Sequence, residues 1–254
     1  MVLGRSKSEG LVSASSAGEV FVTEEMDMIL TTYLTGKPDP QRSMTWKPDD
    51  KNVVDVWIKS LTRQGLHGII FHDSLTEDFC ARWANRNVSF HHIQWNTPWT
   101  AAEERVRIYR DWLRDNPCDK VLTTDLSDVE FYRDPFELMT DPDKLYIGSE
   151  PILIGTDKWM VDRMTATYGE APFQDRFILN PGICGGSRAR MLTFLDQWMD
   201  ELDKAIKPTS PPHDICAFIR LIYREGIPFV TGHPLHTVFR KNQWAWHGAA
   251  IRHK

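Results

Sequence analysis

The feature that most constrains the fold is an alternation of apolar segments with amphipathic helical segments over the first half of the chain. Short apolar runs predict strands at residues 26–36, 67–75, 88–94 and 120–126. Apolar side chains at helical spacing predict helices between them, at residues 51–65, 76–87 and 100–116, with Gly65 as a C-cap and Thr76 as an N-cap. Strands that alternate with helices form a mostly parallel sheet with helices on both faces. The sequence therefore predicts an α/β fold built on such a sheet.

The second half of the chain has a less regular order of elements. Strands are predicted at residues 144–151, 228–232 and 248–254, and helices at 157–169, 188–205 and 211–226. Residues 176–187 predict a strand that runs into a glycine-rich turn. Residues 1–20 are rich in Ser and Gly and predict a flexible leader. We expect residues 21–254 to form one domain.

Composition narrows the class of protein. The formal net charge of −5 argues against an electrostatic nucleic-acid binder, because such domains are usually basic. The four cysteines form no CxxC pair, so neither a zinc ribbon nor a disulfide framework is predicted. No run approaches the roughly 20 apolar residues that span a bilayer, and residues 1–20 lack an apolar signal core. We expect a soluble, cytoplasmic protein.

Three aspartates, Asp125, Asp128 and Asp134, lie at and after the end of the fourth predicted strand, in the segment KVLTTDLSDVEFYRDPF. Asp125 and Asp128 supply two oxygen ligands within a few residues, as a metal site requires. A glycosidase pair is disfavoured, because its two acids are well separated rather than neighbours on one loop. The simplest alternative is a turn in which aspartates, Asp134 among them, cap backbone N–H groups. Metal site and turn both remain open from this segment alone.

The segment TDLSDVEFYRDPF resembles the signature of nucleotide-sugar-dependent glycosyltransferases of the GT-A fold, in which an apolar strand ends in a DxD-type motif followed by an apolar run and RDPF or RDPL. The spacing here is DxxD. Asp128 corresponds to the last acid of the motif and is the expected metal ligand. Asp125 is expected to ligate the metal, directly or through water, or to contact the donor ribose. Asp134 is expected to cap a turn with Pro135.

The resemblance extends from residue 26 to residue 253 and carries further candidates. ILNPGICGGSRARMLTFLDQW is similar to a GT-A segment that faces donor sugar and acceptor, which maps onto Asn180, Gly182, Gly185 and Gly186. A tight turn before a helix is the alternative for these glycines, and no GK[ST] follows that would make a P-loop. HDICAFIRLI resembles an acidic helix start of the same superfamily, which places Asp214 at the site; helix capping, by His213 or Asp214, is the alternative.

The same resemblance implies a third metal ligand from a histidine near the C-terminus. His253 is the first candidate and His236 the reserve. Two carboxylates with an imidazole suit Mn²⁺, with Mg²⁺ as the alternative. Arg105 is expected to reach the donor diphosphate or the acidic motif. Base and ribose are expected to contact the end of the first strand or its neighbour, through Thr31, Thr32, Tyr33, Thr35 and Asp73.

The implied function is metal-dependent transfer of a sugar from a nucleoside-diphosphate sugar to a hydroxyl acceptor, such as a glycan. Asp214 and Glu150 are the candidate bases, and Trp244 and Trp246 are candidates for stacking on sugar rings. The resemblance implies a Rossmann-like GT-A fold with a nucleotide-binding half at about 24–136 and an acceptor half at about 137–254. A sugar-phosphate nucleotidylyltransferase is the nearest alternative, although its GxGxRL loop is absent. A non-catalytic nucleotide-sugar-binding protein is the other.

Overall fold

The computed structural model describes residues 26–37, 45–95, 97–205, 214–238 and 248–253. The predicted leader, His213, Trp244 and Trp246 lie outside the described residues. Among the helices that the structure describes, none is long and apolar enough to cross a membrane.

The core of the fold is a seven-stranded sheet in the order β3-β2-β1-β4-β7-β6-β8. Neighbouring strands are parallel except where β7 pairs antiparallel with both β4 and β6, so the predicted mostly parallel sheet is confirmed. The strands are β1 (Met28–Tyr33), β2 (Gly68–His72), β3 (Val88–His92), β4 (Lys120–Thr124), β6 (Leu145–Leu153), β7 (Phe177–Ser187) and β8 (Phe229–Thr231).

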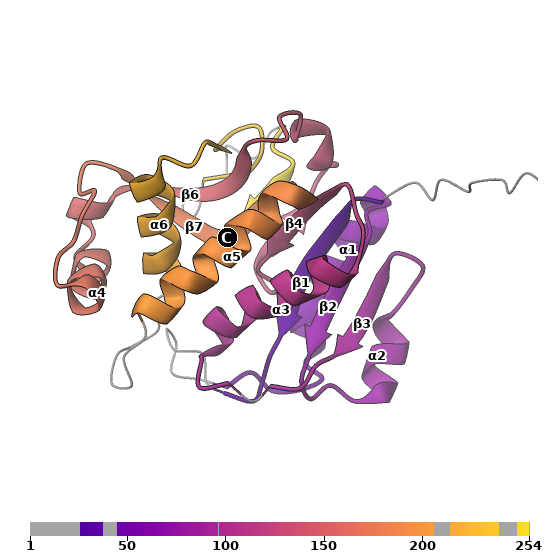
Figure 1. The fold of residues 1–254 in the computed structure, drawn as a ribbon. Helices are drawn as coiled ribbons and strands as arrows, with labels where there is room; N and C mark the ends of the chain where they lie inside the picture. The colour runs from indigo at the N-terminus through magenta and orange to yellow at the C-terminus, as the bar shows by residue number, and fades with distance from the viewer. Residues whose placement is uncertain (1–25, 38–44, 96, 206–213, 239–247, 254) are drawn as a thin grey trace, which may run out of the picture.

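Helices cover both faces of the sheet (Figure 1). Helices α1 (Lys51–Gln64) and α2 (Glu77–Trp83) pack on one face, in a cluster that includes Trp57 and Phe79. The other face packs against α3 (Ala101–Asp115), α5 (Arg188–Ala205) and α6 (Asp214–Glu225), with α4 (Lys158–Tyr168) beside α6. Helices α1 and α3 each bury one side, as amphipathic spacing predicts, whereas α2 buries only Phe79 and α6 is buried over most of its surface. The fold is therefore a three-layer α/β arrangement.

Local capping explains where several helices begin and end. The Thr76 side chain accepts from the backbone N–H of Phe79, and Gly65 ends α1 with a left-handed φ of 70°, so both predicted caps are confirmed. Thr100 and Glu103 form a reciprocal capping box at the start of α3. Asp134 accepts from the backbone N–H of Phe136 at 2.7 Å, at the start of the 3₁₀ turn η1 (Phe136–Leu138).

The predicted glycine-rich turn is wrong, because Gly182, Gly185 and Gly186 all lie inside β7. None of the three has a positive φ. A Cβ on Gly185 would lie 2.7 Å from the carbonyl oxygen of Val121 on the neighbouring β4. Close approach between strands, rather than turn conformation, is the physical reason for glycine there.

A second, two-stranded sheet was not predicted as a pair. β5 (Val129–Phe131) pairs antiparallel with β9 (Ile251–His253), and Val129 lies opposite His253. The predicted C-terminal strand is thus present, in a sheet separate from the main one. Its partner is the segment that directly follows Asp128, so the end of the chain is brought back to the acidic segment.

Candidate metal and ligand site

A pocket lined by charged and polar side chains lies beyond the carboxyl ends of β1 and β4. In the strand order, β1 and β4 meet where the chain reverses its direction of progress across the sheet, which is where open α/β sheets bind ligands. The lining residues come from the ends of these strands, from α1 and the segment before it, and from the first turns of α3 and α6: Thr31, Thr32, Tyr33, Leu34, Trp46, Val53, Ala101, Ala102, Arg105, Thr124, Asp125, Leu126, Ser127, Asp128 and Asp214.

The floor of this pocket is cross-linked between the two strands. Thr31 Oγ1 donates to the carbonyl oxygen of Thr124 at 2.8 Å, and the indole N–H of Trp57 donates to Thr124 Oγ1 at 3.0 Å. All three residues are buried. The backbone that leads into Asp125 is therefore held rigidly by β1 and α1.

Asp125, Asp128 and His253 offer ligand atoms that all lie within 4.8 Å of one another. Asp125 and Asp128 follow β4, and His253 arrives through the β5–β9 pairing. His253 is buried, while the two aspartates are partly exposed toward the pocket. The structure thus brings together the three residues predicted first as metal ligands. Two carboxylates and one imidazole fit a Mn²⁺ ion, or a Mg²⁺ ion that keeps water ligands.

Gly182 gives a steric reason for the compactness of this cluster. Its carbonyl oxygen accepts from the backbone N–H of Asp125 at 2.9 Å. A Cβ at this position would lie 2.6 Å from Cε1 of His253 and would also overlap the carboxylate of Asp125. Any side chain on Gly182 would force the two predicted ligands apart, so the donor set fits a small ion only while glycine stands here.

Arg105 joins two carboxylates at the α3 side of the pocket. Its guanidinium lies 2.5 Å from Asp125 and 3.1 Å from Asp214. Burial raises the pKa of Asp125, but the opposite effects of Arg105 and His253 are together larger. The net pKa therefore lies well below its usual range. Burial raises the pKa of Asp214, and Arg105 offsets this rise only in part. Asp125 is therefore the ionised ligand, and Asp214 the more basic carboxylate.

Asn180 and Glu150 lie side by side on β7 and β6, next to Gly182. The Asn180 side-chain amide donates to Glu150 Oε1 at 3.2 Å, and its oxygen accepts from the Gly182 N–H at 2.9 Å. Both side chains are buried. Glu150 lies within a strand rather than in the exposed turn that its sequence context also allowed. Asn180 therefore links the candidate base Glu150 to the backbone of the metal cluster.

Several candidates serve the fold instead of lining the pocket. Asp73 accepts from the backbone N–H groups of Thr35 and Gly36 at 2.9 and 2.7 Å, so it organises the loop after β1. His236 Nε2 accepts from the N–H of Gly232 at 2.9 Å, and its Nδ1 lies 2.7 Å from the Thr237 carbonyl oxygen. Neither the reserve ligand His236 nor Thr35, Asp73, Gly185 or Gly186 is part of the pocket lining or of the Asp–Asp–His cluster.

Sequence reasoning missed several lining residues, of which Trp46 is the largest. Trp46 packs against the hydrophobic cluster on the α1 face and, like the cluster members Tyr33 and Val53, lines the pocket. No motif marks it, because it stands alone in a polar segment before α1. Ala101 and Ala102 were also missed, since small residues at a helix start carry no chemical signal.

No protein-family model matches the chain, and no curated protein sequence matches it. Function is therefore inferred from the chemistry of the pocket.

Proposed function

We propose that the chain is a metal-dependent glycosyltransferase of the GT-A fold. In this proposal it transfers a sugar from a nucleoside-diphosphate sugar to a hydroxyl group, such as that of a glycan. The observation that supports it best is a pocket with two chemically different sides at the end of the sheet. One side is apolar and aromatic, and the other carries the charges and the candidate metal ligands.

The apolar side comes from the α1 face of the sheet. Tyr33, Val53 and Trp46 belong to that face's hydrophobic cluster or pack against it. The Tyr33 hydroxyl is fixed by the carbonyl oxygen of Lys47 at 2.5 Å and the N–H of Asp50 at 3.2 Å. Rigid aromatic side chains suit a flat ring such as a nucleobase.

The charged side comes from the opposite face and from the end of β4. Arg105 and Asp214 extend from α3 and α6, and Asp125 and Asp128 follow β4. A guanidinium beside a divalent-cation site suits a diphosphate, since both place positive charge at its oxygens. A nucleoside diphosphate has the same division between ring and anion as the pocket.

The chain's own residues account for the remaining requirements. When bound by Asp125, Asp128 and His253, a divalent cation would offset the charge of the diphosphate as its bond to the sugar breaks. Asp214 and Glu150 are the candidate proton acceptors for the acceptor hydroxyl. The raised pKa of Asp214 favours it as a base, because a carboxylate is a better base when its pKa is closer to the working pH.

The proposal is tested with purified protein, MnCl₂ and a panel of nucleotide sugars that differ in base and sugar. We expect one or more donors to bind by calorimetry and to be hydrolysed slowly without an acceptor, with both signals lost after chelation. The same measurements are made with the Asp128→Asn variant, which should lose both donor binding and donor hydrolysis. Binding without hydrolysis or transfer would indicate a non-catalytic nucleotide-sugar-binding protein. Absence of binding for every donor would contradict the proposal.

A further inference from the structure

The loops that follow β1, β2 and β3 form a connected rim beside the pocket. After β2, Asp73 holds the backbone of Thr35 and Gly36, which follow β1. Gly36 lies so close to the other two loops that a Cβ there would be 2.8 Å from Asp73 Oδ2 and 3.4 Å from the Trp95 ring. The rim therefore packs three loops from neighbouring strands into one unit.

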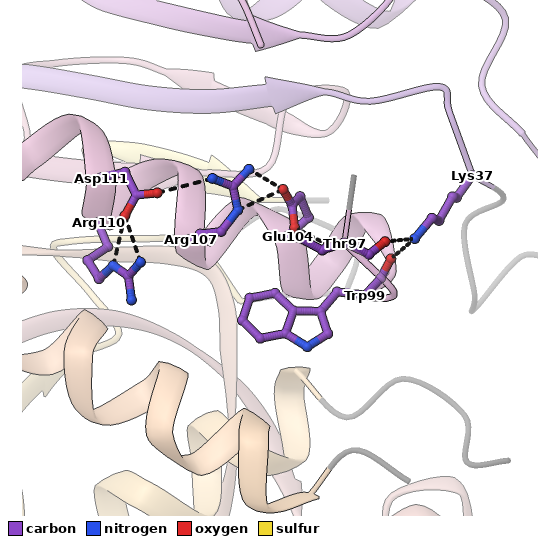
Figure 2. Close-up of polar contacts among 7 residues, drawn as sticks. All are labelled: Lys37, Thr97, Trp99, Glu104, Arg107, Arg110 and Asp111. Carbon is purple, nitrogen blue, oxygen red and sulfur yellow. Dashed lines mark hydrogen bonds and ion pairs between the residues drawn. The ribbon is translucent and has the colours of Figure 1, made fainter. Parts of the chain in front are cut away.

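Lys37 connects this unit to the segment that leads into α3. Its ammonium group donates to the carbonyl oxygens of Thr97 and Trp99, at 2.5 and 2.6 Å, as Figure 2 shows. The same group lies 5.0 Å from the ring centroid of Trp95. Charge-assisted bonds to two carbonyls two residues apart fix both the position and the direction of this backbone.

From Thr97 the contacts continue along one flank of α3 (Figure 2). Thr97 Oγ1 donates to Glu104 at 2.6 Å, and the fully buried Glu104 pairs with Arg107. Arg107 then lies 3.1 Å from Asp111, which also pairs with Arg110. Residues 104, 107 and 111 share one side of the helix, because they are three and four positions apart.

This flank lies next to Arg105 on α3. Successive helical residues are separated by about 100° around the axis. When the flank at Glu104 is held, Arg105 is directed toward Asp125 and Asp214. Ala101 and Ala102, on the same first turn, line the pocket. A rotation of this turn would move the guanidinium and the pocket wall together.

We propose that Lys37 is a positioning residue for the ligand pocket. It fastens residues 97–99 to the rim, and through Thr97 and Glu104 it sets the rotation of the first turn of α3 and the placement of Arg105. Lys37 is not part of the pocket lining, so it acts through α3 rather than on the ligand. The part of the inference that concerns nucleotide binding rests on the proposed function; the part that concerns α3 does not.

The experiment compares Lys37→Met and Lys37→Arg with the wild type, and uses Lys59→Met as the matched control. Lys59 is 69% exposed and pairs with Asp55 one turn away on α1, which packs on the opposite face of the sheet from α3. Hydrogen–deuterium exchange is followed at residues 97–105. Binding of MnCl₂ alone, and of ADP, GDP and UDP with saturating MnCl₂, is measured by calorimetry. Thr97→Val breaks the next contact in the series and serves as a second variant should Lys37→Met fold poorly.

We expect exchange at residues 97–105 to accelerate about tenfold in Lys37→Met and Thr97→Val, because local opening becomes easier. Lys37→Arg should recover most of the protection, and Lys59→Met should match the wild type. The nucleotide that binds best should lose about tenfold in affinity in Lys37→Met, since a small misplacement of a positioning group is costly. The affinity for Mn²⁺ alone should change less than the nucleotide affinity, because β4, β7 and β9 hold its ligands.

Unchanged exchange at residues 97–105 in Lys37→Met and Thr97→Val would overturn the proposal. An equal loss of Mn²⁺ and nucleotide affinity would also overturn it, because it would indicate general destabilisation. If the wild type binds none of the nucleotides, the proposed function fails, whereas the exchange measurements still decide the role of Lys37 in placing α3.

Discussion

At the scale of single residues, Gly182 has the clearest effect on the metal cluster, because the space that it leaves is filled by Asp125 and His253. In Gly182→Ala we expect the affinity for Mn²⁺ to fall by about 10-fold or more, as changes around metal ligands typically do. Isothermal titration with MnCl₂ measures this. The matched control is Gly186→Ala in the same strand, where a Cβ would lie 3.0 Å from the Lys144 carbonyl oxygen and away from the cluster. Equal losses of Mn²⁺ affinity in the two variants would contradict this role.

His236 predicts a pH dependence of stability. Burial lowers its pKa, and its Nε2 accepts a backbone N–H only while that nitrogen is unprotonated. The unfolded chain therefore takes up a proton at higher pH than the folded chain. This contribution to stability is present above the unfolded pKa of 6.5 and is lost as the pH falls through the lower folded value.

We expect the urea midpoint of the wild type, measured in the presence of EDTA, to decrease as the pH is lowered from 7.5 to 5.5. His236→Gln should be less stable at pH 7.5 and should lose less on acidification. Burial also lowers the pKa of His72 and of His91, so part of the wild-type slope should remain. An identical pH slope in wild type and variant would rule out His236 as a source of the dependence.

At the scale of elements, α6 carries Asp214 to the pocket and is fastened to α5 by a buried carboxylate. Glu201 on α5 has no exposed surface and pairs with Arg220 and with Arg224, the latter at 3.0 Å. Removing one partner of a buried ion pair leaves charge uncompensated. The two arginines remain partly exposed, so water can compensate them in part.

We expect Glu201→Gln to lower the free energy of unfolding by about 2–4 kcal/mol, at or below the usual cost of breaking a buried pair. Asp196→Asn is the matched control on the same helix. Asp196 pairs with Arg114 at the surface, where about half of each side chain is exposed, and should cost less than about 1 kcal/mol. Urea denaturation measures both. Similar losses of unfolding free energy in the two variants would show that the buried ion pairs of Glu201 stabilise the fold no more than a surface ion pair.

At the scale of the whole molecule, the layers of the fold were predictable because each element shows its periodicity locally. The alternation up to residue 126 gave the parallel strands and the helices between them, and Gly65 and Thr76 marked helix ends. Pairing between distant segments was not predictable in this way. β5 and β9 are three residues each and far apart in sequence, so no local pattern joins them. The glycines of β7 looked like a turn because only their neighbours in space require them.

The candidate site was predictable where residue type carries chemistry. Asp125, Asp128, Arg105 and His253 were predicted from their residue types together with the resemblance to GT-A segments, and they lie together. Asp73 and His236 have the same chemistry, but backbone groups engage their side chains, and sequence does not reveal such partners. Trp46 was missed because a single tryptophan outside any motif is normally expected to be a core residue rather than a ligand contact.

The measurement that tests the central claim most directly is a titration of MnCl₂ followed by electron paramagnetic resonance. Wild type is compared with Asp128→Asn and with Asp134→Asn, which changes an aspartate of the same segment that caps a turn. The proposed site predicts one Mn²⁺ per chain in the wild type, affinity reduced by about tenfold or more in Asp128→Asn, and wild-type affinity in Asp134→Asn. Absence of stoichiometric Mn²⁺ binding in the wild type, or equal losses in the two variants, would contradict it.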